Sequence, residues 1–184
     1  MFVHGERVDE PLDSNDLTVF IRLGSDFSNN YYEYELPLMP SNPDNVVNGN
    51  PDTRSYKEEV WRPENNFDFP LSLLTEVKKM RNAAPNWDYT NPFVITDPEN
   101  PRARVKVVGN PNLGFVKGAM IGIRNVDDKD KTQHCVEVWV NELRLNGFNE
   151  QAGYAGQARV DMKLADLGNI AVAGNYSSIG WGSI

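Results

Sequence analysis

The sequence predicts a mainly β protein: an antiparallel β-sandwich of the jelly-roll kind with one helix, followed by a C-terminal β-hairpin. Apolar and polar residues alternate in several short runs, one segment repeats apolar residues at helical spacing, and the connections are long and rich in Asn, Pro, Asp and Gly. Such a chain fits an antiparallel sandwich better than an alternation of strands and helices. We expect a sandwich domain over residues 1–150 and an amphipathic hairpin segment over residues 151–184.

Two neighbouring antiparallel strands are predicted near the N-terminus. The first strand places four apolar residues on one face: Leu17, Val19, Ile21 and Leu23. Residues 31–38 alternate in the same way and follow a polar turn, which predicts a second strand paired with the first. Because Pro37 has no N–H to donate to a ladder, the second strand should end there or lie at an edge of the sheet.

The composition changes over residues 40–66, which contain many Asn, Pro and Asp residues and few aliphatic ones. A segment of this length and composition predicts a long irregular excursion over the surface. We expect Tyr56 and Trp61 to hold it to the body of the protein, and its tip to lie near residues 48–51.

One helix is predicted over residues 69–84, where apolar residues recur every three or four positions. Pro70 suits the first turn, and Pro85 ends the pattern. The apolar stripe of this helix should cover one flank of a sheet. It consists of Leu73, Leu74, Val77, Met80 and Ala84.

Two further strands are expected at residues 103–108 and 118–124. A longer one spans residues 136–145, where the apolar alternation slips by one position. A β-bulge at residues 141–142 would restore the register and keep all five aliphatic side chains in the interior. These side chains are Val136, Val138, Val140, Leu143 and Leu145.

The alternation returns in residues 158–164 and 170–176, which are joined by a short link at residues 165–169. This pattern predicts a hairpin with one apolar and one polar face. Outer-membrane barrels use strands of this kind, although any half-buried hairpin shows the same alternation.

The charge balance excludes one class of function. The 184 residues include 18 basic and 26 acidic side chains, which give a formal net charge of −8. Nucleic-acid binding requires clustered Lys and Arg, so we expect no nucleic-acid partner. No apolar run reaches the ~20 residues of a membrane-spanning helix, and the mean hydropathy of −0.53 predicts that these residues are soluble by themselves.

Metal and cofactor chemistry has little support in the sequence. Two histidines and one cysteine exclude a dense metal site, and the alternation around Cys135 predicts a buried thiol instead of a nucleophile. Asp127, Asp128 and Asp130 invite interpretation as a calcium loop, but the glycine and distal glutamate of an EF-hand are missing. A solvated hairpin tip is therefore favoured over a metal site there, and we expect no cofactor.

Five aromatic residues could form a sugar-binding platform, because aromatic rings pack against the apolar faces of sugars. They are Tyr31, Tyr32, Trp61, Trp87 and Tyr89. The alternative is that these rings fill the core and anchor loops. A glycosidase would need two carboxylates at a fixed separation, and the sequence shows no such pair. We therefore expect a protein that is not an enzyme, with cell-surface carbohydrate binding as an alternative function.

The C-terminal part of the chain also resembles a known family. Residues 138–145 read Val-Trp-Val-Asn-Glu-Leu-Arg-Leu, followed by Phe-Asn-Glu at 148–150, Ala-Arg-Val at 158–160 and Lys-Leu-Ala-Asp-Leu at 163–167. Residues 136–175 thereby resemble the SprA/Sov family. Members of this family are very large outer-membrane barrels of Bacteroidetes that serve as the translocon of the type IX secretion system and, in some species, are needed for gliding motility.

This resemblance implies that the chain is one portion of such a translocon, with a structural or interaction role and no catalytic residue carried over. The implied location is the outer membrane of a Gram-negative bacterium, and the implied partners are other translocon subunits or exported cargo. Outer-membrane barrels place short turns on the periplasmic side, so the short link at residues 165–169 would put the sandwich on the cell-surface side, outside the cell or folded into the mouth of the barrel.

Overall fold

The computed structural model describes residues 1–8, 12–14, 16–42, 49–126, 133–147 and 153–178. The chain divides into two compact units, Met1–Leu143 and Arg144–Ile184. Each pair of named strands in the described ranges is antiparallel, so the prediction of a mainly β chain with antiparallel sheets is confirmed. The aspartates considered as a calcium loop, at residues 127–130, lie outside the described residues.

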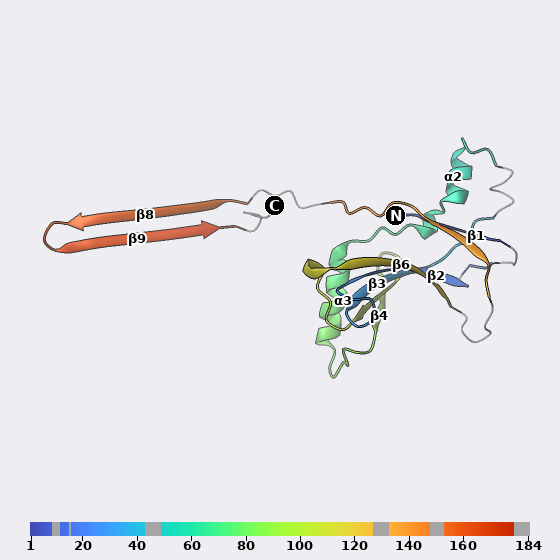
Figure 1. Ribbon diagram of the computed structural model, residues 1–184, viewed down its shortest axis with the longest axis horizontal. Helices are drawn as coiled ribbons and strands as arrows, with labels where there is room; N and C mark the ends of the chain where they lie inside the picture. The colour runs from blue at the N-terminus through green and yellow to red at the C-terminus, as the bar shows by residue number, and fades with distance from the viewer. Residues whose placement is uncertain (9–11, 15, 43–48, 127–132, 148–152, 179–184) are drawn as a thin grey trace. The chain divides into compact units, whose positions relative to one another are not determined.

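A five-stranded sheet forms the centre of the first unit, with its strands in the order β4-β5-β3-β2-β6 (Figure 1). The strands are β2 (Leu17–Gly24), β3 (Tyr31–Pro37), β4 (Phe93–Thr96), β5 (Arg104–Val108) and β6 (Gly118–Asn125). The sequence predicted all of these except β4, whose four residues are too few to show an alternation. β3 ends at Pro37, as expected, although it lies inside the sheet and not at its edge.

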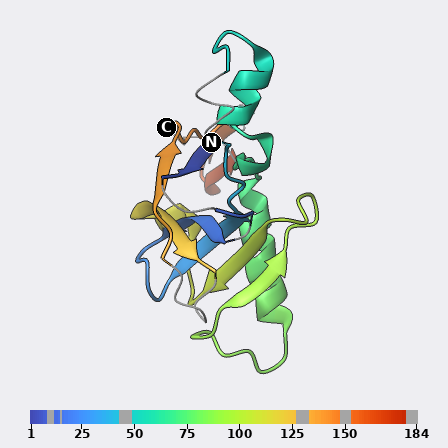
Figure 2. The same ribbon diagram turned by 90° about the vertical axis from the view of Figure 1, so that its right-hand side faces the viewer.

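Cross-strand register gives this sheet one apolar face. Ile21 of β2 lies opposite Tyr34 of β3, which in turn lies opposite Val105 of β5. The helix α3 (Leu71–Ala83) packs on this face and contributes Leu73, Leu74 and Val77 to the buried cluster (Figure 2). The apolar stripe of the helix and the apolar face of the sheet together form the core.

The helix predicted at residues 69–84 is confirmed as α3, but one predicted core position is wrong. Met80 is 52% exposed, and Arg81 is fully buried instead. The Arg81 guanidinium donates to the carbonyl oxygen of Gly109 and lies 4.6 Å from the centre of the Tyr89 ring. A long arginine at the margin of an apolar stripe can bury its stem and reach such an acceptor, which helical periodicity does not reveal.

A separate two-stranded sheet pairs a strand near the N-terminus of the first unit with a strand near its C-terminus. It consists of β1 (Val3–Arg7) and β7 (Val136–Val140). Val3, Val136 and Val138 pack against the same buried cluster as α3 and give the unit its sandwich-like layering. The sequence did not predict β1, because Val3 is the one aliphatic residue among its five and no alternation marks it.

Residues 40–66 were predicted to be irregular, and this prediction is wrong in part. The segment contains the helix α2 (Arg54–Val60) and a 3-10 turn, η1 (Pro63–Asn65). Thr53 caps α2, but the helix buries none of its residues, so no apolar stripe marks it in the sequence. No helix in the described ranges is long and apolar enough to cross a membrane.

Trp61 holds this segment to the body of the protein, as expected. Its ring meets the His4 ring edge-on, with 6.0 Å between the ring centres. His4 Nδ1 lies 2.6 Å from the carbonyl oxygen of Val60, so this nitrogen carries the hydrogen. Ser41 Oγ lies 3.1 Å from the same nitrogen and donates to the carbonyl oxygen of Glu59 at 2.7 Å. His4 and Ser41 therefore hold the segment in place through its backbone carbonyl groups, and they do not form a nucleophile with its base.

The end of β7 differs from the prediction. β7 stops at Val140, and residues 141–147 form no strand. The predicted β-bulge is therefore wrong: Val140, Leu143 and Leu145 are 43%, 47% and 59% exposed. Cys135 is also exposed, contrary to prediction. Val136 and Val138 face the core. Cys135 precedes Val136 directly, so its side chain points to the other face of the β1–β7 sheet.

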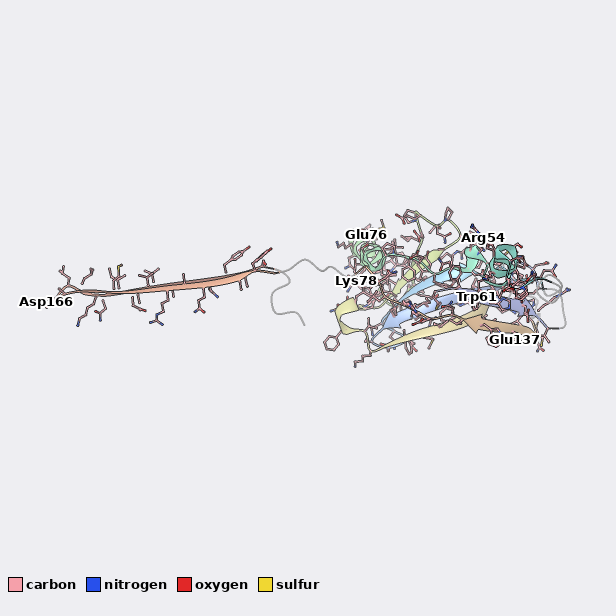
Figure 3. All side chains as sticks on the ribbon, turned by 90° about the horizontal axis from the view of Figure 1, so that it is seen from above. Arg54, Trp61, Glu76, Lys78, Glu137 and Asp166 are labelled. Atoms are coloured by element: carbon pink, nitrogen blue, oxygen red, sulfur yellow. The ribbon has the colours of Figure 1, made fainter. Side chains whose placement is uncertain are left out.

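The second unit contains the predicted hairpin, which is confirmed. Strands β8 (Ala155–Leu164) and β9 (Gly168–Ser177) pair along their whole length. Each residue of both strands is exposed. Figure 3 shows their side chains standing out from both faces of the ribbon, with Asp166 at the turn.

Candidate functional site

Five charged side chains meet on the polar face of the five-stranded sheet, and we call them the charge cluster. They are Arg22 of β2, Glu33 and Glu35 of β3, Lys106 of β5 and Arg124 of β6. Register brings them together, because Glu33 lies directly opposite both Arg22 and Lys106. No local pattern in the sequence predicts this cluster. The alternation of charged residues with core residues in β3 and β5 indicates a charged face, but not which strands contribute to it.

Glu33 is the centre of the charge cluster, and its side chain is fully buried. Arg22 Nε donates to it at 2.5 Å, Lys106 Nζ at 2.8 Å, and Arg124 Nη2 at 3.0 and 3.2 Å. Burial alone would raise the pKa of Glu33. Hydrogen bonds from Lys106 and Arg22, with the charges of Lys106 and Arg124, outweigh burial and lower the pKa to about 2. Glu33 is therefore ionised at neutral pH.

Glu35 completes the charge cluster. Its Oε2 accepts hydrogen bonds from both Lys106 and Arg124. The guanidinium carbons of Arg22 and Arg124 lie 5.0 and 4.7 Å from the centre of the Phe20 ring. Cation–π contact of this kind is favourable, and it accounts for an aromatic residue on the otherwise polar face of β2. Three cations thus surround two carboxylates.

A cavity of about 410 Å³ adjoins the charge cluster near the end of β3 and the start of β5. It is lined by Thr18, Glu35, Pro37, Thr96, Pro101, Arg102, Arg104 and Val126. Thr18 is 7% exposed, and its hydroxyl has no hydrogen-bond partner among the described residues. Arg102 donates to the carbonyl oxygens of Glu64 and Pro37. Arg104 is exposed and forms no ion pair with a described residue.

The rings considered as a sugar platform lie in separate places. Tyr31 and Tyr32 are consecutive in β3 and therefore point to opposite faces of the sheet. The Arg22 guanidinium carbon lies 4.2 Å from the centre of the Tyr31 ring. Tyr32 is 2% exposed and donates its hydroxyl to the carbonyl oxygen of Pro111 at 3.0 Å.

The remaining three rings make contacts of their own. Trp61 meets His4, as described above, and Trp87 packs edge-on against Phe93 with 4.9 Å between ring centres. Tyr89 is 52% exposed and lies beneath Arg81. Among the described residues, no two of the five rings are in contact with each other. Carbohydrate binding by these rings stays a prediction.

One carboxylate outside the charge cluster, Asp26, binds the backbone of its own turn. Asp26 accepts hydrogen bonds from the N–H groups of Ser28, Asn29 and Asn30, which hold the pKa of its carboxyl well below the ordinary value. Within the described ranges, no group of three or more His, Cys, Asp or Glu side chains could hold a metal ion.

The β8–β9 hairpin offers a second candidate surface. Val160 lies opposite Val172 and Met162 opposite Ile170, so these side chains share one face with Leu164. They are 43% to 60% exposed. The other face carries an exposed ion pair between Arg159 and Asp161. An apolar face and two strand edges that no other described residue of this unit covers are typical of an interaction surface.

Comparison with known proteins gives the family to which the chain belongs. A search of curated proteins finds no match to the chain. A family model, SprA_N, described as "Motility related/secretion protein", matches residues 1–184. The resemblance noted at residues 136–175 is thereby confirmed and extends over all 184 residues. The chain belongs to this family of motility-related and secretion proteins.

Proposed function

We propose that the chain is a non-catalytic structural and interaction domain of a large outer-membrane protein-export translocon, the one used in type IX secretion and gliding motility. The match of all 184 residues to a motility and secretion family carries this proposal. The partners are other translocon subunits or the exported cargo.

The β8–β9 hairpin supports an interaction role. A two-stranded ribbon alone is at best marginally stable in water, yet each strand here is ten residues long and exposed along its length. A partner that covered the apolar face would remove its apolar side chains from water. Burial of apolar surface stabilises a complex by about 25 cal/mol per Å². We infer that other parts of the translocon cover this face.

Paired substitutions on the two faces of the hairpin test this role. Val160→Lys with Val172→Lys, introduced in the parent gene of the bacterium, places two charges on the apolar face. We expect export of secreted proteins and colony spreading to be lost, because charged side chains oppose burial of that face. Secreted proteins in the medium and spreading on agar are the measurements.

The matched control is Ala171→Lys with Ala173→Lys, which adds the same charge to the polar face of the same hairpin, on β9. We expect export and spreading at the parental level. Immunoblots of the outer-membrane fraction would separate failed assembly from failed export, and either result supports a structural role. Normal export by the apolar-face variant would contradict the proposal.

We propose further that the first unit lies on the cell-surface side of the outer membrane. The turn between β8 and β9 is short, because β8 ends at Leu164 and β9 begins at Gly168. Short turns belong to the periplasmic side of outer-membrane barrels. Protease added to intact cells should therefore cleave the first unit. Cleavage only after the outer membrane is permeabilised would contradict this location.

A further inference from the structure

We propose that the cavity beside the charge cluster binds a carboxylate carried by an apolar peptide segment, with Arg104 as its ion-pair partner. This inference goes beyond the export role and does not depend on it. It is carried by described side chains of the five-stranded sheet and of the adjoining residues Pro101, Arg102 and Val126.

The local charge favours an anion. The chain as a whole has a net charge of −8, but the polar face of this sheet is cationic. The charge cluster holds three cations and two carboxylates, and Arg102 and Arg104 at the cavity add two more cations. The described lining of the cavity carries two arginines and one carboxylate, Glu35, and a concave surface with such an excess of positive charge concentrates anions.

Of the two described arginines that line the cavity, Arg104 is the one available to bind a ligand. It lies opposite Glu35 of β3 and Thr96 of β4, and so on the same face as both. Lys106 and Arg124 already engage Glu35 through Oε2. Arg104 is exposed and has no ion pair with a described residue. Its planar guanidinium can donate two parallel hydrogen bonds to a carboxylate.

Thr18 supplies a second polar group to the cavity. Its side chain is buried, and its hydroxyl lacks a hydrogen-bond partner among the described residues. A buried hydroxyl without a partner destabilises the folded chain. Less than 1 Å² of this hydroxyl oxygen is accessible in the free chain, so a ligand oxygen reaches it only if the cavity wall shifts. Its lack of a partner is nevertheless a second reason, independent of charge, for an oxygen-bearing ligand.

The shape and lining of the cavity favour a peptide carboxylate over a phosphate. About 410 Å³ is within the size range of ligand sites and exceeds the space that a carboxylate alone would fill. Pro37, Pro101 and Val126 supply apolar walls. The carboxylate of Glu35 in the lining opposes a doubly charged phosphate more than a singly charged carboxylate. The ligand is therefore an Asp or Glu side chain flanked by apolar residues.

Nuclear magnetic resonance titration of the full 184-residue chain tests the proposal. The probes are N-acetyl-Val-Glu-Val-amide, the same peptide with Gln in place of Glu, and inorganic phosphate. We expect the Glu peptide to shift the backbone amide signals of Thr18, Arg104 and Val126 to saturation. The Gln peptide should bind about tenfold more weakly, because a charge-assisted hydrogen bond is lost.

Two variants localise the site. Arg104→Gln should weaken binding of the Glu peptide about tenfold, whereas Arg54→Gln should leave it unchanged. Arg54 is a matched control for charge, since its side chain on α2 is 91% exposed and pairs with Glu58. Thr18→Val should weaken binding a few-fold and raise the Tm of the free chain, because it removes an unpartnered buried hydroxyl.

Three results would overturn the proposal. One is the absence of saturable shifts up to peptide concentrations on the order of 10 mM, well above an ordinary specific Kd. Another is an equal loss of affinity in Arg104→Gln and Arg54→Gln, which would indicate a general charge effect. The third is tighter binding of phosphate than of the Glu peptide at the same residues. Unchanged peptide affinity in Thr18→Val would overturn the role given to Thr18.

Discussion

Replacing Glu33 by Gln tests whether the charge cluster stabilises the sheet. The substitution keeps the shape of a fully buried side chain and removes its charge. The side chains of Arg22 and Lys106 are only 20% and 18% exposed, so both cations would remain partly buried beside a neutral amide. Removing one partner of a buried ion pair costs about 3–5 kcal/mol. Because the cations here can still reach water, we expect the free energy of unfolding at pH 7 to fall by about 3 kcal/mol.

The pKa of Glu33 gives a second value for the stabilisation that its charge provides. The pKa of Glu33 is about 2 in the folded chain against an ordinary value of 4.5. At about 1.4 kcal/mol per pH unit, that interval corresponds to about 3 kcal/mol. Because the folded-state pKa is the lower one, this stabilisation is fully present above pH 4.5 and is lost as the pH falls to 2. The difference between the parent and Glu33→Gln should shrink over this range and vanish below it.

Urea unfolding followed by circular dichroism, at pH 7 and at several values down to about pH 2, measures both effects. Glu58→Gln is the matched control, because it makes the same charge change beside Arg54, whose side chain is 91% exposed. An exposed pair of this kind should contribute less than about 0.5 kcal/mol. The reasoning is refuted if Glu33→Gln costs less than about 1 kcal/mol at pH 7, or if its cost is the same at pH 7 and near pH 2.

Two further substitutions test packing by the same unfolding measurement. In Gly122→Ala, the new methyl carbon would lie too close to Cζ of Phe20 and clash with the ring. We therefore expect the free energy of unfolding to fall by about 1–3 kcal/mol. Gly156→Ala in β8 meets no atom within 4 Å and should have no such cost, and equal losses would contradict the argument. Tyr34→Phe removes the hydroxyl that donates to buried Asp97 at 2.7 Å, for an expected loss of about 1–2 kcal/mol. Tyr176→Phe, at a residue 69% exposed, is its control, and similar stability of these two variants would count against the hydrogen bond.

Local periodicity was sufficient for the elements that bury a regular stripe. The alternation of β2 and β3 and the helical spacing of α3 each reflect one face turned toward the core. α2 escaped prediction because it buries none of its residues and leaves no such pattern. The bulge expected at residues 141–142 assumed that each aliphatic side chain seeks the interior. Instead, the strand ends at Val140, where its pairing with β1 ends.

The candidate site could not be predicted for a different reason. Alternation shows that Arg22, Glu33 and Glu35 share the polar face, but it carries no information on strand order. The charge cluster forms only because β5 pairs with β3 and β6 pairs with β2, which brings Lys106 and Arg124 to the two glutamates. These pairings join segments far apart in the chain, so local sequence patterns do not contain them. The cavity depends on the same pairings and was hidden for the same reason.

Strand order also determines which cation stays available for a ligand. Glu35 and Arg104 lie directly opposite each other on β3 and β5, a position in which unlike charges ordinarily pair. Here Lys106, from the same strand as Arg104, and Arg124, from β6 across β2, both engage Glu35. Competition from these two cations leaves Arg104 without its natural cross-strand partner. The network that stabilises Glu33 at the centre of the sheet is therefore also what keeps the Arg104 guanidinium free of an ion pair with any described residue.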